Sequence, residues 1–162
     1  MAALDILYQD TITLFNRCVQ EDESVVWYPT VIDGVHLILD RAKIVAMYGE
    51  SASVNAMVNI RYSGNRFSPF VAGKPFLSPK EFRKLPWYEA ENYITFAFGE
   101  DFDFIASGMN DGIVENGNFV ADDVYLSFGG FFGYMNKNYE NVFAITGFSQ
   151  YNLMPHFSIT AR

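Results

Sequence analysis

Cysteine and histidine are both scarce in this chain of 162 residues, which has one Cys and two His. A single cysteine, Cys18, cannot form a disulfide within the chain, which excludes the disulfide-stapled secreted proteins and favours a reducing compartment. Neither His36 nor His156 has a Cys, Asp or Glu neighbour at the spacing of metal ligands, so neither a zinc site nor a hydrolytic triad is indicated. We therefore expect no enzymatic activity, no metal and no cofactor.

Positive charge is also in short supply. The chain has 11 Lys and Arg against 19 Asp and Glu, which gives a net charge of −8. Such a surface repels phosphate and offers few of the basic contacts that dominate nucleic-acid affinity. Sequence-specific nucleic-acid binding is therefore not expected.

Targeting and membrane segments are likewise not indicated. The N-terminus has no basic region and places Asp5 and Asp10 too early for a signal peptide. Residues 141–161 contain no Asp, Glu, Lys or Arg, but five polar or helix-breaking residues interrupt them: Ser149, Gln150, Asn152, Pro155 and His156. This segment predicts two short strands and a turn, and no membrane partner is expected.

Apolar and aromatic residues, in contrast, are abundant. Half of the residues are hydrophobic, 17% are aromatic, and the chain has 16 Phe and 10 Tyr. This composition can close a core without metals or disulfides, and aromatic residues suit half-buried strands. The length predicts one domain spanning residues 1–162.

Alternating and β-rich segments predict a mainly β fold. The second of them contains Pro29 and Gly34, which indicate a kink. The predicted strands cover residues 8–16, 25–39, 54–62, 93–98, 142–149 and 156–162. We expect a small antiparallel β-barrel or sandwich with two or three short helices.

Helices are predicted where capping residues occur. One covers residues 40–48 and ends at Gly49, and another begins with the capping box Ser78-Pro79-Lys80-Glu81. Apolar residues recur at helical spacing between residues 122 and 135, although three glycines weaken this pattern. Residues 17–24, 63–73 and 107–121 are predicted to be loops.

Two carboxylates, Asp101 and Asp103, lie at alternate positions beside Glu100. Such a pair could bind a divalent cation or perform acid–base chemistry, as in a ligand-binding β-barrel or a carboxylate-dependent hydrolase. A solvated strand face shows the same pattern, and we favour that interpretation.

The aromatic content exceeds what one small core requires, so part of it is expected at a subunit or partner interface. The residues predicted to lie there are Trp27, Tyr28, Phe128, Phe131, Phe132 and His156.

Four blocks of the chain resemble an uncharacterised family of small proteins from phages and prophages of Gram-positive bacteria. The blocks are Thr-Ile-Thr-Leu-Phe-Asn-Arg (11–17), Trp-Tyr-Pro-Thr-Val-Ile-Asp-Gly-Val (27–35), Tyr-Met-Asn-Lys-Asn-Tyr (134–139) and Leu-Met-Pro-His-Phe-Ser-Ile (153–159). Their order is also similar to that in the head-closure (stopper) or minor capsid proteins of siphophages.

This resemblance implies a structural protein of the virion neck, assembled in the bacterial host cytoplasm. Its copies would form a hexameric or dodecameric ring between a portal-adaptor protein on one side and a tail terminator or tail protein on the other. The ring would enclose DNA without sequence-specific binding, and would close or gate its channel. A tail-completion or tail-terminator protein of the same neck is the alternative.

A lumen that lets DNA slide should avoid basic contacts with phosphate. Residues 107–121 form the longest predicted loop that contains no Lys or Arg. We expect this loop, with Asp111, Glu115 and Asn116, to face the lumen and act as the gating element.

Overall fold

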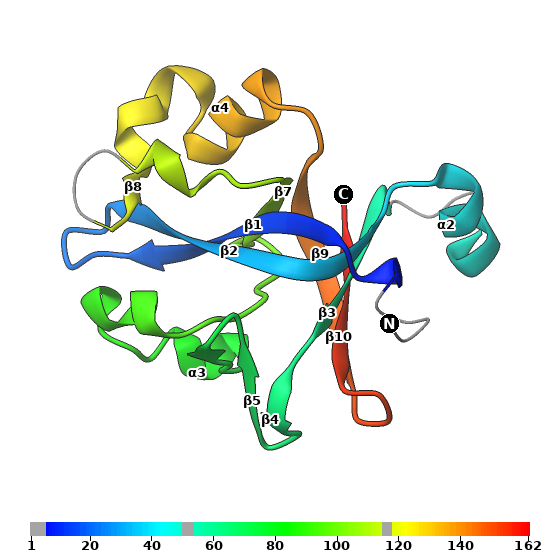
Figure 1. The fold of residues 1–162 in the computed structure, drawn as a ribbon. Helices are drawn as coiled ribbons and strands as arrows, with labels where there is room; N and C mark the ends of the chain where they lie inside the picture. Colours follow the sequence, from blue (N-terminus) through cyan, green and yellow to red (C-terminus); the bar gives the residue numbers. More distant parts are fainter. Residues whose placement is uncertain (1–5, 50–53, 115–117) are drawn as a thin grey trace.

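The computed structural model describes residues 6–49, 54–114 and 118–162. Most of the strands in these residues form one antiparallel sheet (Figure 1). In pairing order they are β1 (Asp10–Val19), β7 (Phe104–Ser107), β9 (Val142–Tyr151), β10 (His156–Ala161), β3 (Ala56–Arg61), β2 (Val25–Ile38) and β8 (Val120–Ala121). Because β2 also pairs with β1, the sheet closes on itself as a small barrel. The predicted fold class is confirmed.

A second, smaller sheet occupies the segment that was predicted to be a loop over residues 63–73. It contains β4 (Ser63–Asn65), β5 (Ser68–Val71) and β6 (Lys74–Pro75). The side-chain oxygen of Asn65 accepts hydrogen bonds from the backbone N–H groups of Phe67 and Ser68, which stabilises the first turn. The loop prediction was wrong because turn residues at both ends concealed two short strands.

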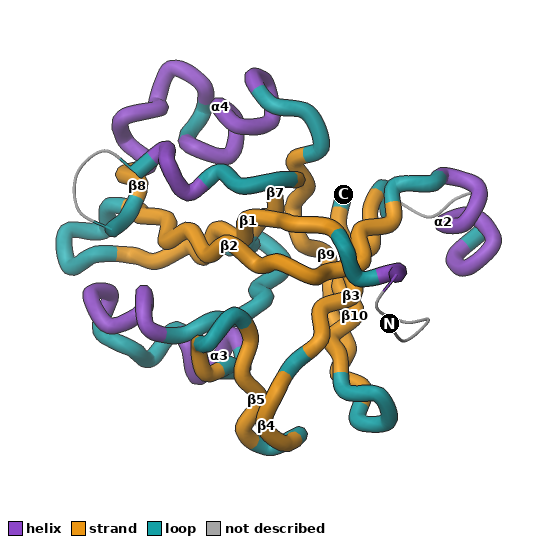
Figure 2. Tube along the Cα trace, viewed as in Figure 1, coloured by secondary structure: helices purple, strands orange, loops and turns teal. Residues whose placement is uncertain are grey.

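Short helices flank the sheet (Figure 2). Among the described residues they are α2 (Arg41–Tyr48), α3 (Pro79–Phe82), η1 (Trp87–Asn92), η2 (Asp111–Ile113), η3 (Asp122–Phe128) and α4 (Phe131–Asn138), the η elements being 3₁₀ helices. Ser78 caps α3 through its side-chain oxygen, as predicted, and Asp40, which was predicted to be the first residue of its helix, caps α2 in the same way. None of the helices in the described residues is long and apolar enough to cross a membrane.

Three other predicted boundaries differ from the structure. β1 extends to Val19, so the turn that follows is shorter than residues 17–24. The predicted helix over residues 122–135 divides into η3 and α4 at Gly129 and Gly130, which both have positive φ angles. The predicted strand 93–98 is an extended segment whose Ile94 forms an isolated bridge to Phe76.

Both faces of β1 are buried, because it separates two hydrophobic clusters. Ile12 and Leu14 face the cluster enclosed by the barrel, together with Val58. Phe15 faces a second cluster beneath α4, where Phe131 packs against it with ring centroids 5.1 Å apart. The chain therefore uses its aromatic residues to build a core outside the barrel as well as inside it.

Candidate functional site

A buried carboxylate marks the polar centre of the molecule. Asp103, which directly precedes β7, is 1% exposed. Its Oδ1 accepts a hydrogen bond from the backbone N–H of Arg17 (2.7 Å), and its Oδ2 accepts bonds from the backbone N–H of Ala97 (2.8 Å) and from Asn16 Nδ2 (3.0 Å). The side chain thus joins β1 to the extended segment before β7.

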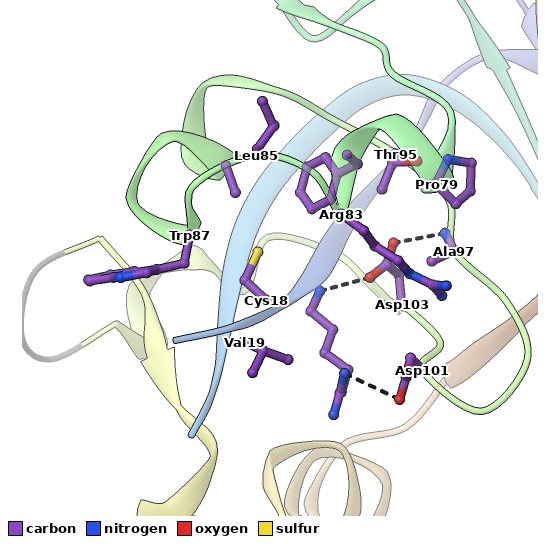
Figure 3. A pocket seen from close by; sticks show the side chains of 13 residues that line it. Cys18, Val19, Pro79, Arg83, Leu85, Trp87, Thr95, Ala97, Asp101 and Asp103 are labelled. Carbon is purple, nitrogen blue, oxygen red and sulfur yellow. Dashed lines mark hydrogen bonds and ion pairs between the residues drawn. The ribbon is translucent and has the colours of Figure 1, made fainter. Parts of the chain in front are cut away.

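The expectation that Asp101 and Asp103 share a solvated strand face is wrong for Asp103. Backbone donors draw this carboxylate inward, whereas Asp101 is exposed and forms an ion pair with Arg17 at 3.3 Å. Figure 3 shows that Asp103 accepts hydrogen bonds from backbone nitrogens, whereas Asp101 pairs with a guanidinium group. They do not form an acid–base pair, and the described residues contain no group of three or more His, Cys, Asp or Glu that could hold a metal ion.

Burial is the main cause of the raised pKa values of Asp103 and Cys18. Loss of solvation raises the pKa of Asp103 to about 7, although hydrogen bonds from Arg17, Ala97 and Asn16 and the positive charge of Arg83 oppose this shift. Burial also raises the pKa of the neighbouring Cys18 thiol to about 12. Cys18 therefore stays protonated near neutral pH and is a poor nucleophile.

A cavity of about 250 Å³ opens beside Asp103 (Figure 3). β1 contributes Val19 to its wall, α3 contributes Phe82, the turn that follows contributes Leu85, and η1 contributes Trp87. Thr95 also lines the cavity, and its buried hydroxyl oxygen has no hydrogen-bond partner. The cavity thus combines an apolar wall with the charged side chains of Arg17, Arg83, Asp101 and Asp103 and with one hydroxyl that has no partner.

Three residues predicted at an interface lie in the chain's own core. Trp27 and Tyr28 are each 4% exposed, and Phe131 is fully buried. Trp27 Nε1 donates a hydrogen bond to Asp122 Oδ1 at 2.9 Å, which fixes the indole beneath η3. The prediction is corrected for these residues, because Trp27 and Phe131 are buried in the second cluster and Tyr28 is buried in a third cluster with Cys18 and Phe82.

The other predicted site residues remain on or near the surface. Phe128 is 38% exposed, and Phe132 and His156 are half-buried. The His156 ring stacks on Tyr151 with centroids 4.9 Å apart. Asp111 is exposed in η2, while Glu115 and Asn116 lie outside the described residues.

The sequence reasoning missed an apolar surface at the ends of two hairpins. Phe67, in the β4–β5 hairpin, is 81% exposed, and Leu153, between β9 and β10, is 90% exposed. The hairpin ends are neighbours, because Gln150 Nε2 donates a hydrogen bond to the carbonyl oxygen of Arg66 at 2.9 Å. The sequence did contain one indication of this surface, because residues 54–77 and 141–162 contain no Asp or Glu.

These features define a small closed antiparallel β-barrel protein with a second aromatic core, a polar cavity and projecting hairpins. The chain belongs to a family of unknown function, DUF6751, whose model matches residues 7–162. Searches of curated proteins and of solved structures found no match to the chain.

Proposed function

We propose that the chain is a structural subunit of a tailed-phage head–tail connector, which forms a ring between adaptor and tail and closes or gates the DNA channel. The main observation in support is the pair of adjacent hairpin ends that present exposed apolar side chains beyond a closed barrel. The proposal also draws on the resemblance of four sequence blocks to phage neck proteins. Clusters of exposed apolar residues are typical of surfaces that contact other proteins.

The closed sheet limits how such a subunit can associate. Because β2 pairs with both β1 and β3, most of the long strands have neighbours on both sides. Edge-to-edge strand addition is therefore disfavoured, and assembly has to use side chains on projecting elements. The two hairpin ends are such elements.

The charge distribution suits a protein that surrounds DNA without holding it. The net charge is −8, and Asp111 is exposed in a segment without Lys or Arg. Such a surface makes few of the phosphate contacts that would hold a duplex in place. In this proposal the exposed segment around Asp111 faces the lumen, while the adaptor and the tail terminator or tail protein cover the two axial faces.

The alternative within the same assembly is a tail-completion or tail-terminator protein. Both roles require a small subunit that forms a ring, and the barrel with its apolar hairpin ends serves either. The two roles differ in the neighbours they require, since a closure protein contacts the adaptor and a terminator contacts the major tail protein.

The experiment introduces a stop codon at Trp27 in a phage that encodes the chain and examines the particles by electron microscopy. Loss of a closure protein should give tailless heads that have released their DNA, together with free tails of normal length. Loss of a terminator should instead give filled heads and tails of irregular length. Normal infectious particles without this chain would refute both roles, and a parallel phage with a synonymous codon change at the adjacent Val26 is the control.

A further inference from the structure

The two hairpin ends form a protrusion that we call the knob, defined as Phe67, Tyr151, Leu153 and Met154. Their exposed fractions are 81%, 49%, 90% and 55%. Tyr151 and Met154 are both held in place, because the Tyr62 hydroxyl donates a hydrogen bond to the Tyr151 carbonyl oxygen and His156 Nδ1 lies 2.8 Å from the Met154 carbonyl oxygen. The knob is therefore an ordered apolar surface.

The turn that contains Leu153 and Met154 has two features that are unusual for a turn exposed to solvent. Met154 has a φ of 54°, in the left-handed region that Gly and Asn tolerate better. Leu153 beside it exposes almost its whole side chain. Neither residue gains burial within the chain that would offset its unfavourable conformation or exposure, so both features point to a contact outside it.

The cavity beside Asp103 is a matching depression, which we call the hole, defined as Val19, Phe82, Leu85, Trp87 and Thr95. Val19 is 49% exposed, and the Thr95 hydroxyl has no partner. A side chain entering the hole would contact apolar groups on β1 and on the segment from α3 to η1. The same cavity is also lined by the charged side chains of Arg17, Arg83, Asp101 and Asp103. The apolar wall of the hole can receive an apolar side chain from a polypeptide.

The chain segments that supply the knob and the hole differ in charge. Residues 17–24 and 78–103, which supply the hole, contain nine carboxylates and four Lys or Arg. Residues 61–70 and 148–157, which supply the knob, contain Arg61 and Arg66 and no Asp or Glu. This difference favours contact between a knob and a hole and disfavours contact between two holes.

We infer that the knob of one copy of this chain docks into the hole of the next copy. The two surfaces lie apart on the molecule, since Figure 1 shows the β9–β10 hairpin at the lower right and the segment containing α3 toward the lower left. A contact between different surfaces is head-to-tail, and it generates a ring when the rotation between subunits closes. The inference rests on the proposed function, because it identifies the contact between subunits of the ring.

The test uses one variant on each surface and measures mass by sedimentation at protein concentrations up to about 1 mM. Leu153→Asp removes the knob, and Val19→Glu blocks the hole while leaving the knob intact. Both side chains are exposed, so neither change should unfold the chain. Leu126→Asp and Val124→Glu, at exposed apolar positions of η3, are the matched controls.

We expect the wild-type chain and both controls to form oligomers with rising concentration, and each of the two test variants to remain monomeric alone. An equimolar mixture of the test variants should form a dimer and nothing larger, because one functional knob and one functional hole remain. The inference would be overturned if the wild-type chain stayed monomeric or if the Val19→Glu variant formed oligomers alone. It would also be overturned if the mixture of the two test variants stayed monomeric. A neck ring that persists in a Leu153→Asp phage would overturn the docking but leave the connector role, whereas absence of the chain from the neck would overturn that role.

Discussion

Replacing Asp103 with Asn tests whether this buried carboxylate makes stability depend on pH. The native side chain accepts three hydrogen bonds and is 1% exposed. Asn has nearly the same shape but cannot ionise, so the variant removes the titration while keeping most of the packing. Its amide nitrogen would face at least one of the native donors, which predicts a loss of about 1–3 kcal/mol even where Asp103 is protonated.

The sign of the pH effect follows from the raised pKa. Because the pKa of Asp103 rises from 3.8 to about 7 on folding, the folded chain holds this proton more tightly than the unfolded chain. The contribution is fully present below pH 3.8 and is lost as the pH rises through about 7. At about 1.36 kcal/mol per pH unit, the change across this window is about 4 kcal/mol.

The assay is urea unfolding of the wild-type chain and the Asp103→Asn variant at several pH values between about 4 and 8. The unfolding free energy of the wild-type chain minus that of Asp103→Asn should fall by about 4 kcal/mol as the pH rises, so the variant, which is the less stable protein near pH 4, should become the more stable one near pH 8. Asp101→Asn, which removes only an exposed ion pair, should change stability by less than about 1 kcal/mol. Parallel pH profiles for the wild-type chain and Asp103→Asn would refute the reasoning.

Three further substitutions probe the second core and its supports. Phe131→Ala should lower the free energy of unfolding by about 3–5 kcal/mol in urea denaturation, because it empties a fully buried site. Asp122→Ala should cost about 2–4 kcal/mol, since Trp27 Nε1 and the Phe131 N–H both donate to this carboxylate, and Trp27 fluorescence should report the change. Gly133→Ala should cost about 1–3 kcal/mol and lower the thermal midpoint, because the added Cβ would overlap the Phe128 carbonyl oxygen. An unchanged midpoint would contradict the close approach of η3 and α4.

Local signals were sufficient for several elements of the fold. The alternation over residues 54–62 predicted β3, whose Val58 and Ile60 are buried as expected. Ser78 marked the start of α3 and Gly49 the end of α2, because capping depends on residues only a few positions away. Such features could be predicted because their causes lie within a few residues.

Features that depend on distant segments could not be predicted in this way. Thr13 and Phe15 are buried on the face of β1 opposite Leu14, because residues nearly 100 positions later cover them. Asp103 has the same local pattern as the exposed Asp101, and its burial depends on donors supplied by residues 16 and 17. The knob and hole likewise each combine segments that are remote in the chain.

The closure of the barrel has a consequence for how the chain folds. β1 pairs with β7 about 90 residues later, and β3 pairs with β10 at a similar separation. Folds dominated by such non-local pairs have high contact order and fold slowly, because long loops must close before the contacts form. A nascent subunit therefore cannot complete its barrel until β10 has been synthesised. Since β9 and β10 also carry most of the knob, the surface proposed for assembly becomes ordered only when the barrel itself is complete.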